Sequence, residues 1–74
     1  MYIVINCASD GDSYNIHHTL EEAQKDFNTQ KSDIEDAEFY EDALYLASVV
    51  PGTKFGWGAH GDFFGGELIA EFSL

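Results

Sequence analysis

The chain has 74 residues, which is enough for one domain spanning residues 1–74. Its 14 Asp and Glu residues stand against three Lys and no Arg, so the formal net charge is −11. This excess of carboxylates excludes direct binding to nucleic acid or anionic lipid, because both need basic groups that displace counterions. A hydrophobic content of 45% excludes a disordered tail, and a single cysteine excludes an internal disulfide.

The sequence favours a cytoplasmic protein. No apolar run approaches the roughly 20 residues that a membrane span needs. The apolar stretch at residues 2–8 has no basic region before it, so it does not resemble a secretory signal. Cys7 lies in this stretch, where it is expected to be a small buried hydrophobe in a reducing compartment.

Residues 2–8 are rich in β-branched side chains and predict a strand. Asp10-Gly11 is a strong hairpin signal, so residues 13–18 are expected to form the returning strand. Alternation places one set of apolar side chains on a common face. This set consists of Ile3, Ile5, Cys7, Tyr14 and Ile16.

A helix is expected to follow. Thr19 and Glu22 have the spacing of a capping box, and Leu20, Ala23 and Phe27 repeat at helical intervals. These signals predict a helix over residues 20–30. A second capping-box spacing, from Ser32 to Glu35, predicts a further short helical segment over residues 33–39.

Two more strands are predicted, at residues 43–50 and 67–74. In the last strand, alternation places Leu68, Ala70, Phe72 and Leu74 inward. The element order ββαββ predicts an α+β fold, in which one helix packs on one face of an antiparallel sheet.

Residues 51–66 hold six of the seven glycines, and residues 56–61 have the pattern G-x-G-x-x-G. A dinucleotide loop needs a helix directly after its glycines, and no helix can start well at residues 62–66. We therefore expect no nucleotide. Two interpretations of the loop remain open: its aromatic rings close one end of the core, or Trp57, Phe63 and Phe64 are anchors for another protein.

The histidines give little support for chemistry. His17 and His18 are adjacent in a predicted strand, so their rings should point to opposite faces. His60 and Asp62 could supply two metal ligands, but no spacing in the chain requires a third. No nucleophile occupies a recognisable turn. We expect neither an enzyme nor a bound metal or cofactor.

Residues 33–42 contain six acidic residues and no basic one. Carboxylates four residues apart on a helix are about 6 Å apart along its axis, which resembles the spacing of phosphates along a nucleic acid strand. The run is either a solvated surface or a site that binds a basic partner. In the second case, the expected partner-binding residues are Glu21, Glu22, Asp26, Asp33, Glu35, Asp36, Glu38, Tyr40, Glu41, Asp42, Trp57, Phe63 and Phe64.

In size and charge, the chain resembles the small acidic inhibitors that bacteriophages make against host defences, including anti-CRISPR proteins and DNA mimics. The acidic run at residues 33–42 carries this resemblance, together with Glu21, Glu22 and Asp26. It implies a non-enzymatic inhibitor in the host cytoplasm that blocks a basic protein or a nucleic acid-binding complex. The alternative is an assembly module that forms a homodimer through its sheet edge or its glycine-aromatic loop.

Overall fold

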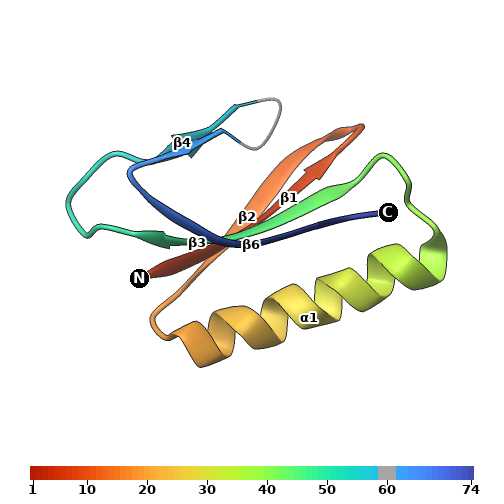
Figure 1. Cartoon of the computed structure of the whole chain (residues 1–74), viewed down its shortest axis with the longest axis horizontal. Helices are drawn as coiled ribbons and strands as arrows, with labels where there is room; N and C mark the ends of the chain where they lie inside the picture. The colour runs from red at the N-terminus through yellow and green to blue at the C-terminus, as the bar shows by residue number, and fades with distance from the viewer. Residues whose placement is uncertain (59–61) are drawn as a thin grey trace.

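The computed structural model describes residues 1–58 and 62–74, and it confirms the α+β class (Figure 1). One helix accompanies a four-stranded sheet and a separate two-stranded hairpin. Within the described residues, the helix lacks the combination of length and apolar character that crossing a bilayer requires. The elements in chain order are β1 (Tyr2–Ala8), β2 (Gly11–His17), α1 (Leu20–Ala37), β3 (Ala43–Val49), β4 (Gly56–Trp57), β5 (Phe63–Phe64) and β6 (Gly66–Ser73).

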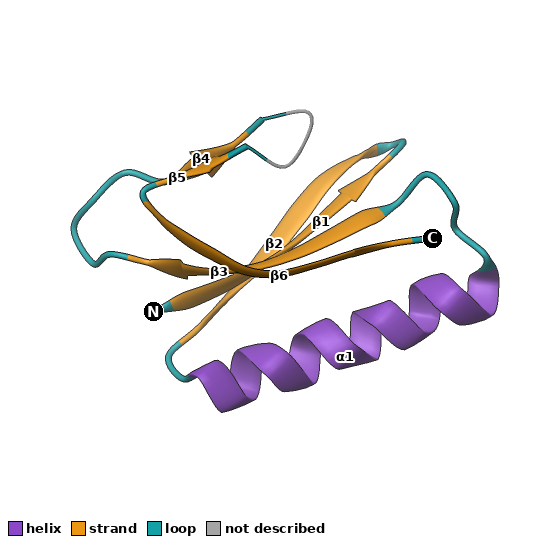
Figure 2. Ribbon diagram, in the orientation of Figure 1, coloured by secondary structure: helices purple, strands orange, loops and turns teal. Residues whose placement is uncertain are grey.

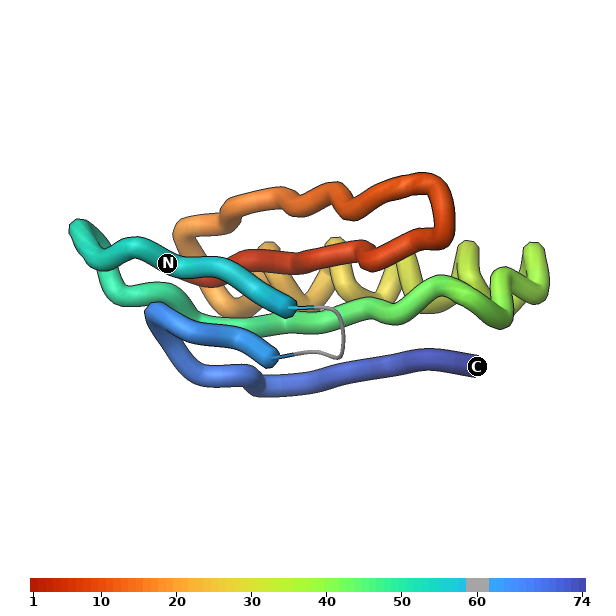
Figure 3. Tube along the Cα trace, turned by 90° about the horizontal axis from the view of Figure 1, so that it is seen from above, coloured from red at the N-terminus to blue at the C-terminus, as the bar shows by residue number. Residues whose placement is uncertain are grey.

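The four-stranded sheet is antiparallel and has the order β2-β1-β3-β6, so β2 and β6 are its edges (Figure 3). Ile3 pairs with Ile16, and Ile5 pairs with Tyr14. Residues that are directly opposite in an antiparallel pair share a face, so the common face expected for these side chains is confirmed.

The helix α1 packs on one face of the sheet. Its buried residues Ala23, Phe27 and Ile34 meet Val4, Leu44 and Leu46 in one core. The capping box is confirmed, because the Thr19 hydroxyl accepts a hydrogen bond from the Glu22 N–H. The prediction that the helix ends near residue 30 is wrong. Ile34 lies seven residues beyond Phe27 and continues the same apolar stripe, so the helix runs unbroken to Ala37.

The opposite face of the sheet is also covered, by a hairpin that the predicted order ββαββ did not include (Figure 2). Ile3, Ile5, Ala47 and Val49 form a second core. The hairpin β4–β5 and the chain before it place aromatic rings on this core, from Phe55, Trp57 and Phe63. The central strand β1 buries consecutive side chains because it has a core on each side.

The last strand, β6, contains an irregularity that changes which residues face inward. Leu46 pairs with Ala70, but the next residue, Ala47, pairs with Leu68, so Ile69 is an extra residue at a β-bulge. Ala70 packs against the helix-side core as expected, as does Phe72. Leu68 and Leu74 are exposed, at 41% and 47%, so their predicted inward placement is wrong.

Candidate functional site

Three segments of the chain meet at one end of the molecule (Figure 1). Because β1 and β3 are antiparallel neighbours, the β1–β2 turn lies beside the start of β3. The helix α1 ends on the same side and connects to β3 through residues 38–42. These segments carry eight of the 14 acidic residues of the chain. We call them the acidic end: Asp10, Asp12, Asp33, Glu35, Asp36, Glu38, Glu41 and Asp42.

The surface of the acidic end contains three adjoining hollows. The first lies between α1 and β1, and both Asp33 and Asp42 line it. The second lies beside the β1–β2 turn, where Asp10 and Asp42 line it. The third is lined by Asp12 and Glu41 and shares part of its wall with the second. Each hollow therefore has two carboxylates in its lining.

Phe39 lines both the first and the second hollow and is 52% exposed. It directly follows the helix cap, where its N–H donates to the carbonyl of Ile34 at 3.1 Å. The next residue, Tyr40, is 69% exposed. Sequence reasoning included Tyr40 and missed Phe39. The only sequence signal for Phe39 is that it is an apolar residue within an acidic run. This signal does not identify a binding residue, because an apolar residue at such a position can equally be buried in the core.

The end of α1 breaks the usual rules of helix termination. Glu38 is the cap and adopts the left-handed conformation with φ 55°, which normally favours glycine. No basic residue lies in the last turn, although cations are preferred there. Glu35 and Asp36 instead place negative charge at the negative end of the helix dipole. Glu35, Asp36 and Glu38 therefore each lower the stability of the fold at the C-terminal end of α1.

The described part of the chain offers these carboxylates no internal counter-charge. Its one side-chain ion pair joins His17 to Asp26, away from the acidic end. The amine of Lys31, one turn before the end of α1, lies 5.1 Å from the centre of the Phe72 ring. The charge of the acidic end is therefore directed to solvent or to a partner.

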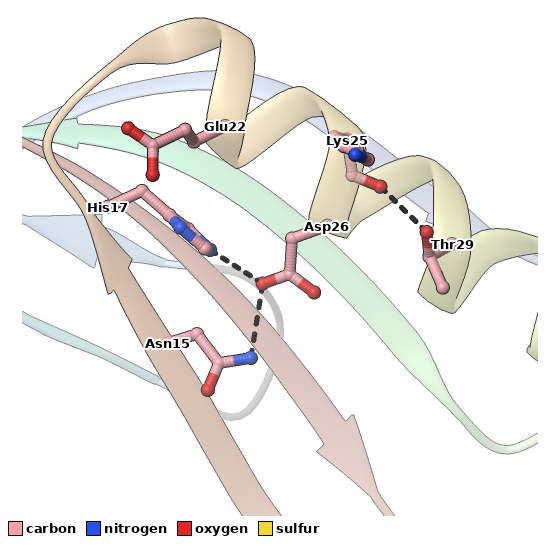
Figure 4. Close-up of a pocket in the computed structure, with 6 residues that line it drawn as sticks. All are labelled: Asn15, His17, Glu22, Lys25, Asp26 and Thr29. Atoms are coloured by element: carbon pink, nitrogen blue, oxygen red, sulfur yellow. Dashed lines mark hydrogen bonds and ion pairs between the residues drawn. The ribbon is translucent and has the colours of Figure 1, made fainter.

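The structure does not bring Glu21, Glu22 and Asp26 to the acidic end. They lie in the first turns of α1, and the helical rise places Glu21 roughly 22 Å from Asp36 along the axis. Glu22 belongs to the capping box. Asp26 accepts hydrogen bonds from His17 and Asn15 across the gap to β2 (Figure 4). The predicted acidic site is therefore divided, and only residues 33–42 combine with the β1–β2 turn.

The aromatic rings of residues 51–66, which we call the glycine loop, differ in their burial. Trp57 and Phe63 are half-buried against the second core, and the Trp57 ring N–H donates to Asp12 Oδ2 at 2.9 Å. These two residues therefore help to close the second core. Phe64 is 61% exposed and crosses over Gly56, where a side chain would meet its ring. It is not in the lining of the hollows at the acidic end.

Cys7 lines the third hollow but is not a reactive nucleophile. Burial, together with the charge and hydrogen bond of Asp12, raises the pKa of its thiol to about 11. The thiol therefore stays protonated at neutral pH. Within the described residues, no group of three or more His, Cys, Asp and Glu is placed to hold a metal ion. His60, from the predicted His60–Asp62 pair, lies outside those residues.

Comparisons of the chain with protein-family models, with curated proteins and with solved structures give no match. The proposal for the function therefore rests on the geometry and charge of the acidic end.

Proposed function

We propose that this protein is a non-enzymatic inhibitor whose acidic end occupies a basic, nucleic acid-binding surface of another protein. The observation that supports this proposal is the position of the eight acidic-end carboxylates, which come from three separate segments. They include residues that weaken the end of α1. Features that lower stability without a structural benefit are typical of functional sites.

Physical chemistry favours a basic partner. Carboxylates held close together repel one another, and a positively charged groove relieves this repulsion on binding. The same field attracts the partner over a distance of about a Debye length, roughly 8 Å at physiological salt. A groove that binds nucleic acid is rich in Lys and Arg, so it matches this surface. Occupying the groove excludes the nucleic acid.

The resemblance to phage-encoded inhibitors gives the partner a biological class. It would be a nucleic acid-binding protein or complex of a host defence, and the protein would act as a stoichiometric blocker in the host cytoplasm. Carboxylates take the place of phosphates in such a contact.

Charge reversal at the acidic end tests the proposal. The first variant, which we call the acidic-end variant, changes Glu38, Glu41 and Asp42 to Lys. The matched control changes Glu21, Glu67 and Glu71 to Lys. The two variants have the same net charge. We expect wild type and control to capture the same partner from native cells and to displace its nucleic acid. The acidic-end variant should do neither. Equal capture and displacement by both variants would contradict the proposal.

The second candidate function is an assembly module. One observation favours it: β6 is an open edge of the sheet, and its Leu68 and Ile69 are 41% and 45% exposed. If a homodimer forms through this edge, changing Leu68 and Ile69 to Lys should dissociate it. The molar mass measured by light scattering would then fall to that of a monomer. The acidic-end variant would not affect it.

A further inference from the structure

We infer that the partner contacts the acidic end with an arginine side chain that lies against the Phe39 ring, in a hollow beside it. This inference rests on the proposed function and names the group that the acidic end recognises. It assigns a binding role to Phe39, which the charge pattern alone does not identify.

The position of Phe39 supports the inference. About half of its surface is exposed, although it follows directly after a helix that buries three residues. It lines two hollows of about 230 and 320 Å³. Aromatic side chains, including Phe, are enriched at protein–protein interfaces relative to the rest of the surface. Phe39 therefore offers an apolar surface beside the acidic residues of both hollows.

The lining of the hollows defines the chemistry of the occupant. Asp42 lines both of them, with Asp33 in one and Asp10 in the other. Apolar contact is also available in the second hollow, from Ala8. A suitable group therefore has an aliphatic stem, a positive charge and a surface that packs on an aromatic ring.

Arginine meets these requirements better than lysine. Its guanidinium is planar and weakly hydrated, so it can stack on Phe39 while the N–H groups at its edge donate to the carboxylates. The lysine ammonium is a compact and strongly hydrated charge, which loses more hydration in such a contact. Electrostatic attraction alone would not distinguish the two, because both carry one positive charge.

Two peptides of equal length, one of arginine and one of lysine, serve as the probes. We expect wild type to bind the arginine peptide about fivefold more tightly than the lysine peptide in calorimetry, at constant salt. Phe39→Ala should reduce this preference to about one. Phe64→Ala is the matched control, because it removes another ring that is more than half exposed, away from the acidic end, and it should keep the preference.

Proton NMR of the unmodified protein gives a second test that does not depend on a variant. Arginine side-chain protons that stack on Phe39 should shift upfield, and the Phe39 ring resonances should shift with them. Phe39→Leu should abolish the shift while it keeps an apolar residue at this position.

The outcomes separate this inference from the proposed function. An arginine preference that is the same in wild type and Phe39→Ala overturns the inference, as does an absence of ring-current shifts. If the acidic-end variant also loses capture of the partner, the proposed function stands without a role for Phe39. If the acidic-end variant and its charge-matched control capture and displace equally, the proposed function fails as well.

Discussion

His17 Nε2 lies 2.8 Å from Asp26 Oδ2, and this contact joins the edge strand β2 to the helix α1 (Figure 4). Asp26 also accepts hydrogen bonds from Asn15 and Gln30. Burial would raise the pKa of Asp26, but the hydrogen bonds from His17, Gln30 and Asn15 outweigh it and hold the pKa below its usual value. This carboxylate therefore has a structural role, as does Asp12 of the acidic end, which accepts the Trp57 ring N–H.

The lowered pKa predicts a pH-dependent effect of Asp26→Asn. The folded pKa lies below the unfolded value of about 3.9, so the stabilising contribution is complete above that value and is lost as pH falls through the folded pKa. We expect Asp26→Asn to lower the free energy of unfolding by about 1 to 2 kcal/mol at neutral pH. The difference from wild type should shrink steadily below about pH 4.

Urea denaturation at a series of pH values measures this effect. Glu21→Gln is the control, because it removes an exposed carboxylate from α1. Glu21 is not one of the residues that form hydrogen bonds with Asp26. A destabilisation by Asp26→Asn that stays constant down to pH 2 would show that the ionised carboxylate is not the source of the effect.

The cap of α1 predicts a trade-off between stability and binding. Glu38→Gly removes the steric strain of the left-handed conformation and one negative charge at the end of the dipole. We expect a gain of about 1 kcal/mol in the free energy of unfolding, together with weaker binding to the arginine peptide. Glu38→Gln removes the charge but keeps the strain, so it should weaken binding equally and stabilise less. Equal stabilisation by both variants would contradict the contribution of strain.

Local patterns in the sequence predicted much of the fold. The capping box at Thr19 placed the start of α1 to the residue, and Asp10-Gly11 placed the first hairpin. Both signals depend on neighbours within a few residues, so they can be recognised without tertiary structure. The end of α1 could not be predicted in the same way, because Glu38 adopts a conformation for which its residue type gives no signal.

The second core and the complete acidic end depend on contacts that are distant in sequence. The strands β4 and β5 have two residues each, which is too short for an alternation pattern. Asp10 and Asp12 join the acidic run only because β1 pairs with β3. The sequence therefore identified residues 33–42 as a candidate site, while the topology determined which other carboxylates belong to it.

The second core predicts unequal roles for two aromatic residues of the glycine loop. Trp57 packs on this core, forms an edge contact with Tyr14 at 5.5 Å and donates to Asp12. We expect Trp57→Ala to lower the free energy of unfolding by about 2 to 3 kcal/mol, which is less than for a fully buried tryptophan. Phe64→Ala should change stability much less, because its ring lies on the outer side of Gly56. Thermal unfolding compares them, and equal losses would contradict this division.

The raised pKa of Cys7 predicts slow alkylation of the folded protein. Because the thiolate is the reactive form and the pKa is about 11, the rate with iodoacetamide should increase about tenfold per pH unit between pH 7 and 10. Asp12→Asn removes one cause of the raised pKa, so it should increase the rate at pH 8. Asp10→Asn is the control, because Asp10 neighbours the same turn but does not contribute to the shift. A folded protein that reacts with an apparent pKa near the ordinary value of about 8.5 would show that Cys7 is solvated, and that Asp12 does not control its environment.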